Sequence, residues 1–163
     1  MTRRSSTVPD RFTPAHIRIL AKLATGASSA SAALDLDITT GTLGTQVQAM
    51  GRRAGVSGRA PLLHTAYRTR QLPLPERAVF AGALDDAEVQ MVQLVASGAS
   101  VQEIADVCRI SRDTAKARLK LLRGRVGAEN DAHLVMQGWR YGWLDESHEV
   151  RPASFLSAVR VGG

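Results

Sequence analysis

The chain has 163 residues, of which 44% are hydrophobic and 4% aromatic, and its formal net charge is +6 with a pI of about 10.4. The hydrophobic content excludes a disordered tail, and a single cysteine excludes both an intrachain disulfide and a four-thiolate zinc site. The basic excess favours an anionic partner, with nucleic acid ahead of an anionic membrane.

Four helices are predicted in residues 12–72. Thr13-Pro14 begins the first helix, because proline is tolerated at the first helical position, and Gly26 ends it. Ser28, or the serine after it, begins the second helix and Thr39 begins the third. A hydroxyl at such a position accepts a hydrogen bond from the free N–H groups of the helix that follows.

Residues 73–83 are predicted to form a short, stiff linker. Pro73 and Pro75 cannot continue a helix, because proline lacks the backbone N–H group. We expect residues 77–83 to add a turn of helix at the end of this linker.

Residues 84–144 give the same order of four helices. Gly98 ends the first helix, Asp86 to Ala96, as a left-handed terminal residue. Ser100 and Glu103 form a capping box at the start of the second helix. The third helix runs from Arg112 to Arg125 behind its cap Ser111, and the fourth runs from Asp131 to Arg140 and closes on Trp139 and Trp143.

An internal repeat relates these two segments. Residues 12–72 align with residues 84–144 without a gap, at a constant shift of about 72 residues. Gly26 falls on Gly98 and Thr39 on Ser111, and the apolar rows coincide. The repeat predicts an all-α fold of two tandem four-helix domains, 12–72 and 84–144, joined by the linker 73–83. A flexible arm, 1–11, precedes them and a tail, 145–163, follows.

The second copy resembles the LuxR/GerE-type (NarL/FixJ-like) helix-turn-helix DNA-binding domain. The resemblance rests on Gly98-Ala-Ser100, Glu103-Ile104-Ala105, Ile110-Ser111, Thr114-Ala115-Lys116 and Val126-Gly127-Ala128. The first copy matches at Phe12-Thr13-Pro14, Gly26-Ala-Ser28, Ile38-Thr39 and Ala54-Gly55-Val56. It departs from the pattern at Ser31-Ala32-Ala33, which replaces Glu-Ile-Ala, and at Gly44, which replaces the lysine.

This resemblance implies that the third helix of each domain lies in the DNA major groove and that the fourth helix is a dimer surface. In the second copy it implies DNA contacts by Thr114, Lys116 and Arg118, where Arg118 replaces the histidine that is usual in the family. Arginine is longer and permanently charged, so Arg118 is expected to reach a different base or a phosphate.

The third helix of the second copy is strongly basic. Arginine contacts guanine in the major groove, and both arginine and lysine bind phosphates. A basic helix face that is simply solvated is the alternative to a DNA contact. The candidate DNA-binding residues of this helix are Arg112, Thr114, Lys116, Arg118, Lys120 and Arg123.

The third helix of the first copy is polar but largely uncharged. Glutamine is able to read adenine, and threonine to contact a thymine methyl group. The alternative is that this copy is a spacer or a dimerisation module, and the sequence leaves both open. Arg3, Arg4 and Arg11 form either a minor-groove arm or a solvated tail. In the third helix of the first copy, the candidate DNA-binding residues are Thr40, Thr42, Thr45, Gln46 and Gln48, and Arg52 and Arg53 are expected to contact the phosphate backbone.

These features predict a sequence-specific transcriptional regulator that binds double-stranded DNA and is not an enzyme. We expect no cofactor and no metal site, because the histidines lack ligand spacing and no catalytic constellation is present. Possible partners are RNA polymerase or a sigma factor, and a second copy of the chain bound through the fourth helices or the C-terminal tail. Alternative functions are a non-specific, architectural DNA-binding protein of a mobile element and a polymerase-interacting adaptor.

The expected location is the bacterial cytoplasm, on the nucleoid. No apolar run approaches the ~20 residues that a membrane-spanning helix needs. The N-terminus also lacks the apolar stretch of a signal peptide.

Overall fold

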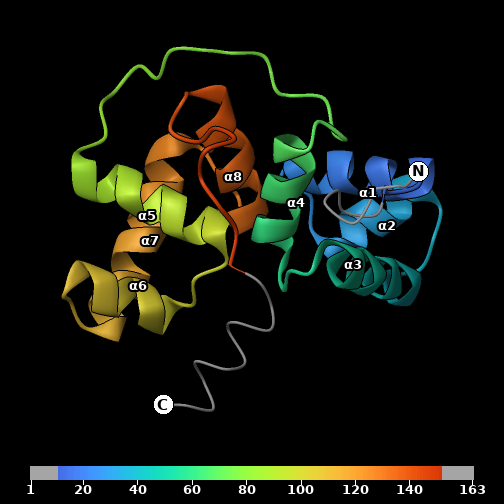
Figure 1. Ribbon diagram of the computed structural model, residues 1–163, viewed down its shortest axis with the longest axis horizontal. Helices are drawn as coiled ribbons and strands as arrows, with labels where there is room; N and C mark the ends of the chain where they lie inside the picture. Colours follow the sequence, from blue (N-terminus) through green and yellow to red (C-terminus); the bar gives the residue numbers. More distant parts are fainter. Residues whose placement is uncertain (1–10, 152–163) are drawn as a thin grey trace, which may run out of the picture.

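The computed structural model describes residues 11–151, and this part of the chain is entirely helical (Figure 1). Its helices form two runs of four, with 11, 8, 15 and 10 residues in the first run and 12, 8, 15 and 10 in the second. The helices are α1 (Pro14–Ala24), α2 (Ser29–Leu36), α3 (Thr40–Ala54), α4 (Arg59–Arg68), α5 (Asp86–Ser97), α6 (Val101–Cys108), α7 (Arg112–Val126) and α8 (Asp131–Arg140).

The predicted N-caps are confirmed in both runs. The side chain of Thr13 accepts a bond from the backbone N–H of His16 at 3.1 Å, and Ser28 begins α2 in the same way. Ser100 and Glu103 form the predicted capping box. Thr39 and Ser111 cap α3 and α7.

The turns between α2 and α3 and between α6 and α7 are made without glycine. Asp37 ends α2 with φ of 59°, and Arg109 ends α6 with φ of 60°. This left-handed conformation is uncommon for residues other than glycine. Its occurrence at equivalent places in the two runs shows that the same tight turn connects α2 to α3 and α6 to α7.

The prediction of a helical turn in residues 77–83 is wrong, because these residues form an irregular segment. The backbone N–H of Ala78 donates to the carbonyl of Arg140 at 3.0 Å, at the end of α8. The ring of Phe80 lies 5.2 Å from those of both Tyr141 and Trp143, between ring centroids. The linker is therefore attached to the second run, and packing there replaces helix formation.

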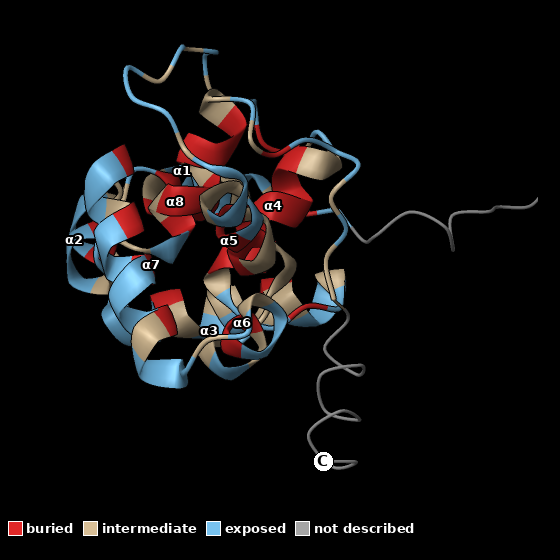
Figure 2. Cartoon of the chain, turned by 90° about the vertical axis from the view of Figure 1, so that its left-hand side faces the viewer, coloured by how far each residue is buried: buried red, intermediate tan, exposed pale blue. Residues whose placement is uncertain are grey.

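The two runs pack against each other through their fourth helices. α4 and α8 lie side by side at the centre of the molecule (Figure 1), and every residue from Ala60 to Tyr67 is buried. Figure 2 shows both helices largely in the colour of buried residues. The rings of Tyr67 and Trp139, at equivalent positions of the repeat, lie 5.5 Å apart.

The contacts between the runs are reciprocal. α1 packs on α8, and α5 packs on α4. A Cβ atom added to Gly26 would lie 2.6 Å from the ring of His133, and one added to Gly98 would lie 3.3 Å from Pro61. Pro61 and His133 are themselves equivalent positions of the repeat. This is the pattern that an approximate two-fold axis between the runs produces.

A buried histidine is hydrogen-bonded at this interface. The Nδ1 atom of His64 accepts the indole N–H of Trp139 at 2.9 Å, so its Nε2–H donates to the carbonyl of His148 at 2.6 Å. Burial lowers the pKa of His64 from 6.5 to about 4, although the bond to the His148 carbonyl opposes this shift. His64 is therefore neutral at pH 7. Trp139 was expected to close the core of the second run, whereas it also joins the two runs.

The expected homodimer through the fourth helices does not fit this arrangement, because the face of α4 is already covered within the chain. The start of the tail is hydrogen-bonded to both runs, although most of residues 145–149 are exposed. The Arg68 guanidinium donates to the Glu146 carbonyl at 3.0 Å, and the Arg151 N–H donates to the Ser97 carbonyl at 2.9 Å. Residues 1–10 of the expected N-terminal arm and residues 152–163 of the tail lie outside the described residues.

Candidate nucleic-acid interface

α7 is oriented by one apolar face. Ala115, Leu119, Leu122 and Val126 are buried at helical spacing, as the periodicity of the sequence predicts. Ser111 caps the helix by accepting the backbone N–H of Thr114 at 3.0 Å. The opposite face of α7 is consequently held toward solvent.

Three predicted contact residues share one exposed side of α7. Arg112, Lys116 and Lys120 follow one another at intervals of four residues and are all exposed. No hydrogen bond or ion pair joins any of their side chains to another residue of the range 11–151. Their charges are therefore available to an external anion.

Arg118 is also exposed but lies on a different flank of α7. An α-helix turns roughly 100° per residue, so Arg118 is rotated by roughly 200° from Lys116. It borders a pocket beside the start of α5, together with Asp85, Glu88 and the exposed Leu121. Arg118 therefore does not share the exposed side of α7 that carries Lys116 and Lys120.

Two further cations of α7 are engaged inside the molecule. Arg123, a predicted contact residue, forms an ion pair with Asp131 of α8 at 2.9 Å. Arg125 pairs with Glu88 of α5 and donates to the carbonyl of Ala83. Both arginines stabilise the packing of α7, which leaves them less available for DNA.

α3 is oriented like α7 but carries different side chains. Leu43 and Met50 are buried, and the side chain of Thr39 caps the helix at Thr42. The side-chain oxygen of Gln46 forms a hydrogen bond of 2.7 Å with the ring of His16, which makes this side chain less available to a base. The predicted residues that are exposed on α3 are Thr40, Thr42, Thr45, Gln48, Arg52 and Arg53.

Of the two arginines in the last turn of α3, one is bonded within the molecule. Arg53 donates to the backbone carbonyl of Arg11 at 2.9 Å, whereas Arg52 has no partner among the described residues. Sequence patterns alone did not reveal the bonds of Gln46, Arg53 and Arg123, because their partners are brought close by tertiary packing.

Gly44 of α3 aligns with Lys116 of α7 in the repeat, so α3 has a glycine where α7 has a lysine. A Cβ atom added there would meet nothing within 4 Å. Gly44→Ala is expected to raise the free energy of unfolding by about 0.5–1 kcal/mol, because glycine loses more backbone entropy than alanine in a helix interior. Urea denaturation followed by circular dichroism measures this change, and a decrease in stability would contradict it.

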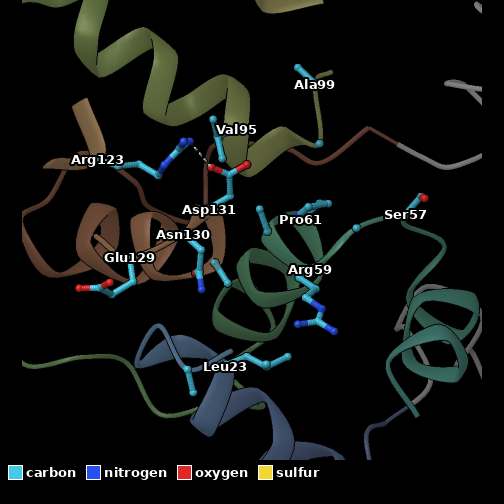
Figure 3. Close-up of a pocket in the computed structure, with 15 residues that line it drawn as sticks. Leu23, Ser57, Arg59, Pro61, Val95, Ala99, Arg123, Glu129, Asn130 and Asp131 are labelled. Atoms are coloured by element: carbon cyan, nitrogen blue, oxygen red, sulfur yellow. Dashed lines mark hydrogen bonds and ion pairs between the residues drawn. The ribbon is translucent and has the colours of Figure 1, made fainter. Parts of the chain in front are cut away.

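A cavity of about 590 Å³ lies between the two runs (Figure 3). Leu23 and Val95 line it from equivalent positions, as do Arg59 and Asp131. Figure 3 shows Arg123 reaching toward Asp131 at its edge. The cavity therefore lies at the N-terminal ends of α4 and α8.

In residues 11–151, no three histidine, cysteine, aspartate or glutamate side chains gather where they would hold a metal ion. No helix within this range is both long and apolar enough to cross a membrane.

Residues 83–137, which contain α5, α6, α7 and the first part of α8, match the family model of the bacterial regulatory proteins of the luxR family (GerE). This match indicates a DNA-binding transcription regulator with a helix-turn-helix, and the family is not one of enzymes. The match covers the second run of helices. Neither the curated proteins nor the solved structures include a match to the chain.

Proposed function

We propose that the chain is a sequence-specific regulator of transcription that binds double-stranded DNA with two tandem LuxR-type domains, 12–72 and 84–144. In this proposal α7 and α3 each enter a major groove. The observation that carries it is the exposed, unpaired row of Arg112, Lys116 and Lys120 on α7, within the segment that matches the family. Cations displayed on an exposed helix fit the acceptor groups of guanine and the DNA phosphates.

The packing of α4 on α8 supports the use of both runs by one molecule. Covalent linkage raises the effective concentration of the second contact, so no second chain is needed for two half-sites to be bound. Successive major grooves on one side of the duplex then place the half-sites about 10 bp apart. Such a regulator would act on the nucleoid, in the bacterial cytoplasm.

Lys116→Ala tests this function. We expect the variant to bind its selected DNA site about 10- to 100-fold more weakly, because one good contact with a base contributes about 1–3 kcal/mol of discrimination. Its affinity for random duplex is expected to fall much less. Gel-shift titrations of both duplexes at one fixed salt concentration measure the two effects.

The matched control is Lys22→Ala. Lys22 lies on α1, away from the α7 row, and pairs with Asp35 at 3.2 Å. This variant removes one positive charge without touching the proposed contact, so its affinity for the site should stay close to that of the wild type. Equal affinities of the Lys116→Ala and wild-type proteins would refute the proposed role of α7.

A protein partner is a second candidate, favoured by apolar side chains left in solvent. Leu34 on α2 is 80% exposed and Leu121 on α7 is 69% exposed. Polymerase or a sigma factor would bind through such residues. Binding that relies on phosphate contacts weakens steeply with salt. DNA affinity that hardly changes between 50 and 200 mM salt would favour this adaptor function over DNA binding.

A further inference from the structure

The outward faces of α3 and α7 differ in charge at equivalent positions. Lys116 and Lys120 of α7 are exposed, and their side chains form no hydrogen bond or ion pair with any residue of the described part of the chain. The repeat places Gly44 and Gln48 at these two positions of α3. One run of helices therefore presents lysines where the other presents an uncharged surface.

The polar groups that α3 exposes are suited to an A·T pair, whereas the lysines of α7 are suited to guanine. Gln48 and Thr45 point away from the buried Leu43 and have no side-chain bond within residues 11–151. Glutamine pairs with the N6 and N7 atoms of adenine, and a threonine methyl group contacts the methyl group of thymine. Lysine instead donates to the O6 and N7 atoms of guanine.

The contacts between the runs hold the two faces in one fixed arrangement. α3 and α7 lie on opposite sides of the central α4–α8 pair (Figure 1). Two hydrogen bonds connect the two runs. The indole N–H of Trp139 donates to His64, and the Arg68 guanidinium donates to the carbonyl of Glu146, which follows α8. A homodimer presents two identical helices and is matched by a palindrome, whereas this chain presents two unlike helices in a set order.

We propose that the chain binds a non-palindromic DNA site in a single orientation. α7 lies over a guanine-containing half-site, and α3 lies over an A·T-rich half-site that Gln48 and Thr45 read. This inference rests on the proposed function and deepens it by defining the kind of site that is bound.

The first test selects sites for the full chain from a duplex library with about 30 randomised base pairs, a length that holds two half-sites about 10 bp apart with flanks. We expect an enriched motif with two unlike halves, one containing guanine and one rich in A·T pairs. Binding to the motif should weaken as salt is raised, as phosphate contacts require.

The second test makes α3 resemble α7 with the variant Gly44→Lys/Gln48→Lys. The open space around the Cβ position of Gly44 accepts the new side chain. We expect the variant to prefer a duplex with two inverted guanine-containing half-sites, which it should bind about tenfold more tightly than the wild type does. The matched control, Gly44→Ala/Gln48→Ala, changes the same positions without adding charge and should show no such gain.

The outcomes separate this inference from the function on which it rests. A palindromic motif, or one with sequence preference in a single half-site, would overturn the fixed orientation but leave DNA recognition by α7 intact. A chain that binds no duplex in a salt-dependent way would overturn the proposed function as well.

Discussion

Trp139→Ala is expected to lower the free energy of unfolding by about 3–5 kcal/mol, as removal of a buried tryptophan usually does. Trp139 is 5% exposed and packs its ring against Tyr67 of the opposite run. Its loss also leaves the buried Nδ1 atom of His64 without a donor, which adds the cost of an unsatisfied polar group. Urea denaturation at pH 7, followed by far-ultraviolet circular dichroism, measures the change.

Trp143→Ala is the matched control, because the chain has two tryptophans and this one is half-buried. Trp143 contacts Phe80 of the linker and Tyr141 rather than the other run of helices. We expect its replacement to cost about 1–2 kcal/mol, within the range of ordinary substitutions. Equal losses for the two variants would show that Trp139 has no special role in joining the runs.

The sequence predicted the helices well, because their signals are local. Thr13, Ser100 and Ser111 cap helices by bonds to residues three positions away. The buried face of α7 follows from the spacing of its apolar residues alone. These features need no knowledge of the rest of the fold.

The packing of the two runs against each other could not be predicted from the sequence, because it depends on contacts between residues far apart in the chain. The bond between His64 and Trp139 joins positions 75 residues apart. The bond of Gln46 to His16 also joins distant positions, and the ion pair of Arg123 with Asp131 depends on how α7 and α8 pack together. The different direction of Arg118 was available from helical geometry, since residues two positions apart lie on different sides of a helix.

The free energy of unfolding is expected to fall as the pH is lowered from about 6.5 to about 4. Folding lowers the pKa of His64 from 6.5 to about 4, chiefly by burial. Between these values the unfolded chain binds a proton at His64 that the folded chain does not, so a lower pH favours unfolding. The loss is on the order of 3 kcal/mol and is complete near pH 4, because below that both states are protonated.

Urea denaturation of the wild type and of His64→Gln between pH 7 and pH 4 checks this assignment. Glutamine keeps a donor and an acceptor at position 64 but does not titrate, so most of the fall in stability should disappear in the variant. Burial also lowers the pKa of His133, and His133→Gln is therefore expected to remove a smaller part of the fall in the same direction. The lowered pKa of Asp145 contributes only below its ordinary value of 3.8, outside this window. A His64→Gln protein that loses as much stability as the wild type would mean that other groups bind the proton on unfolding.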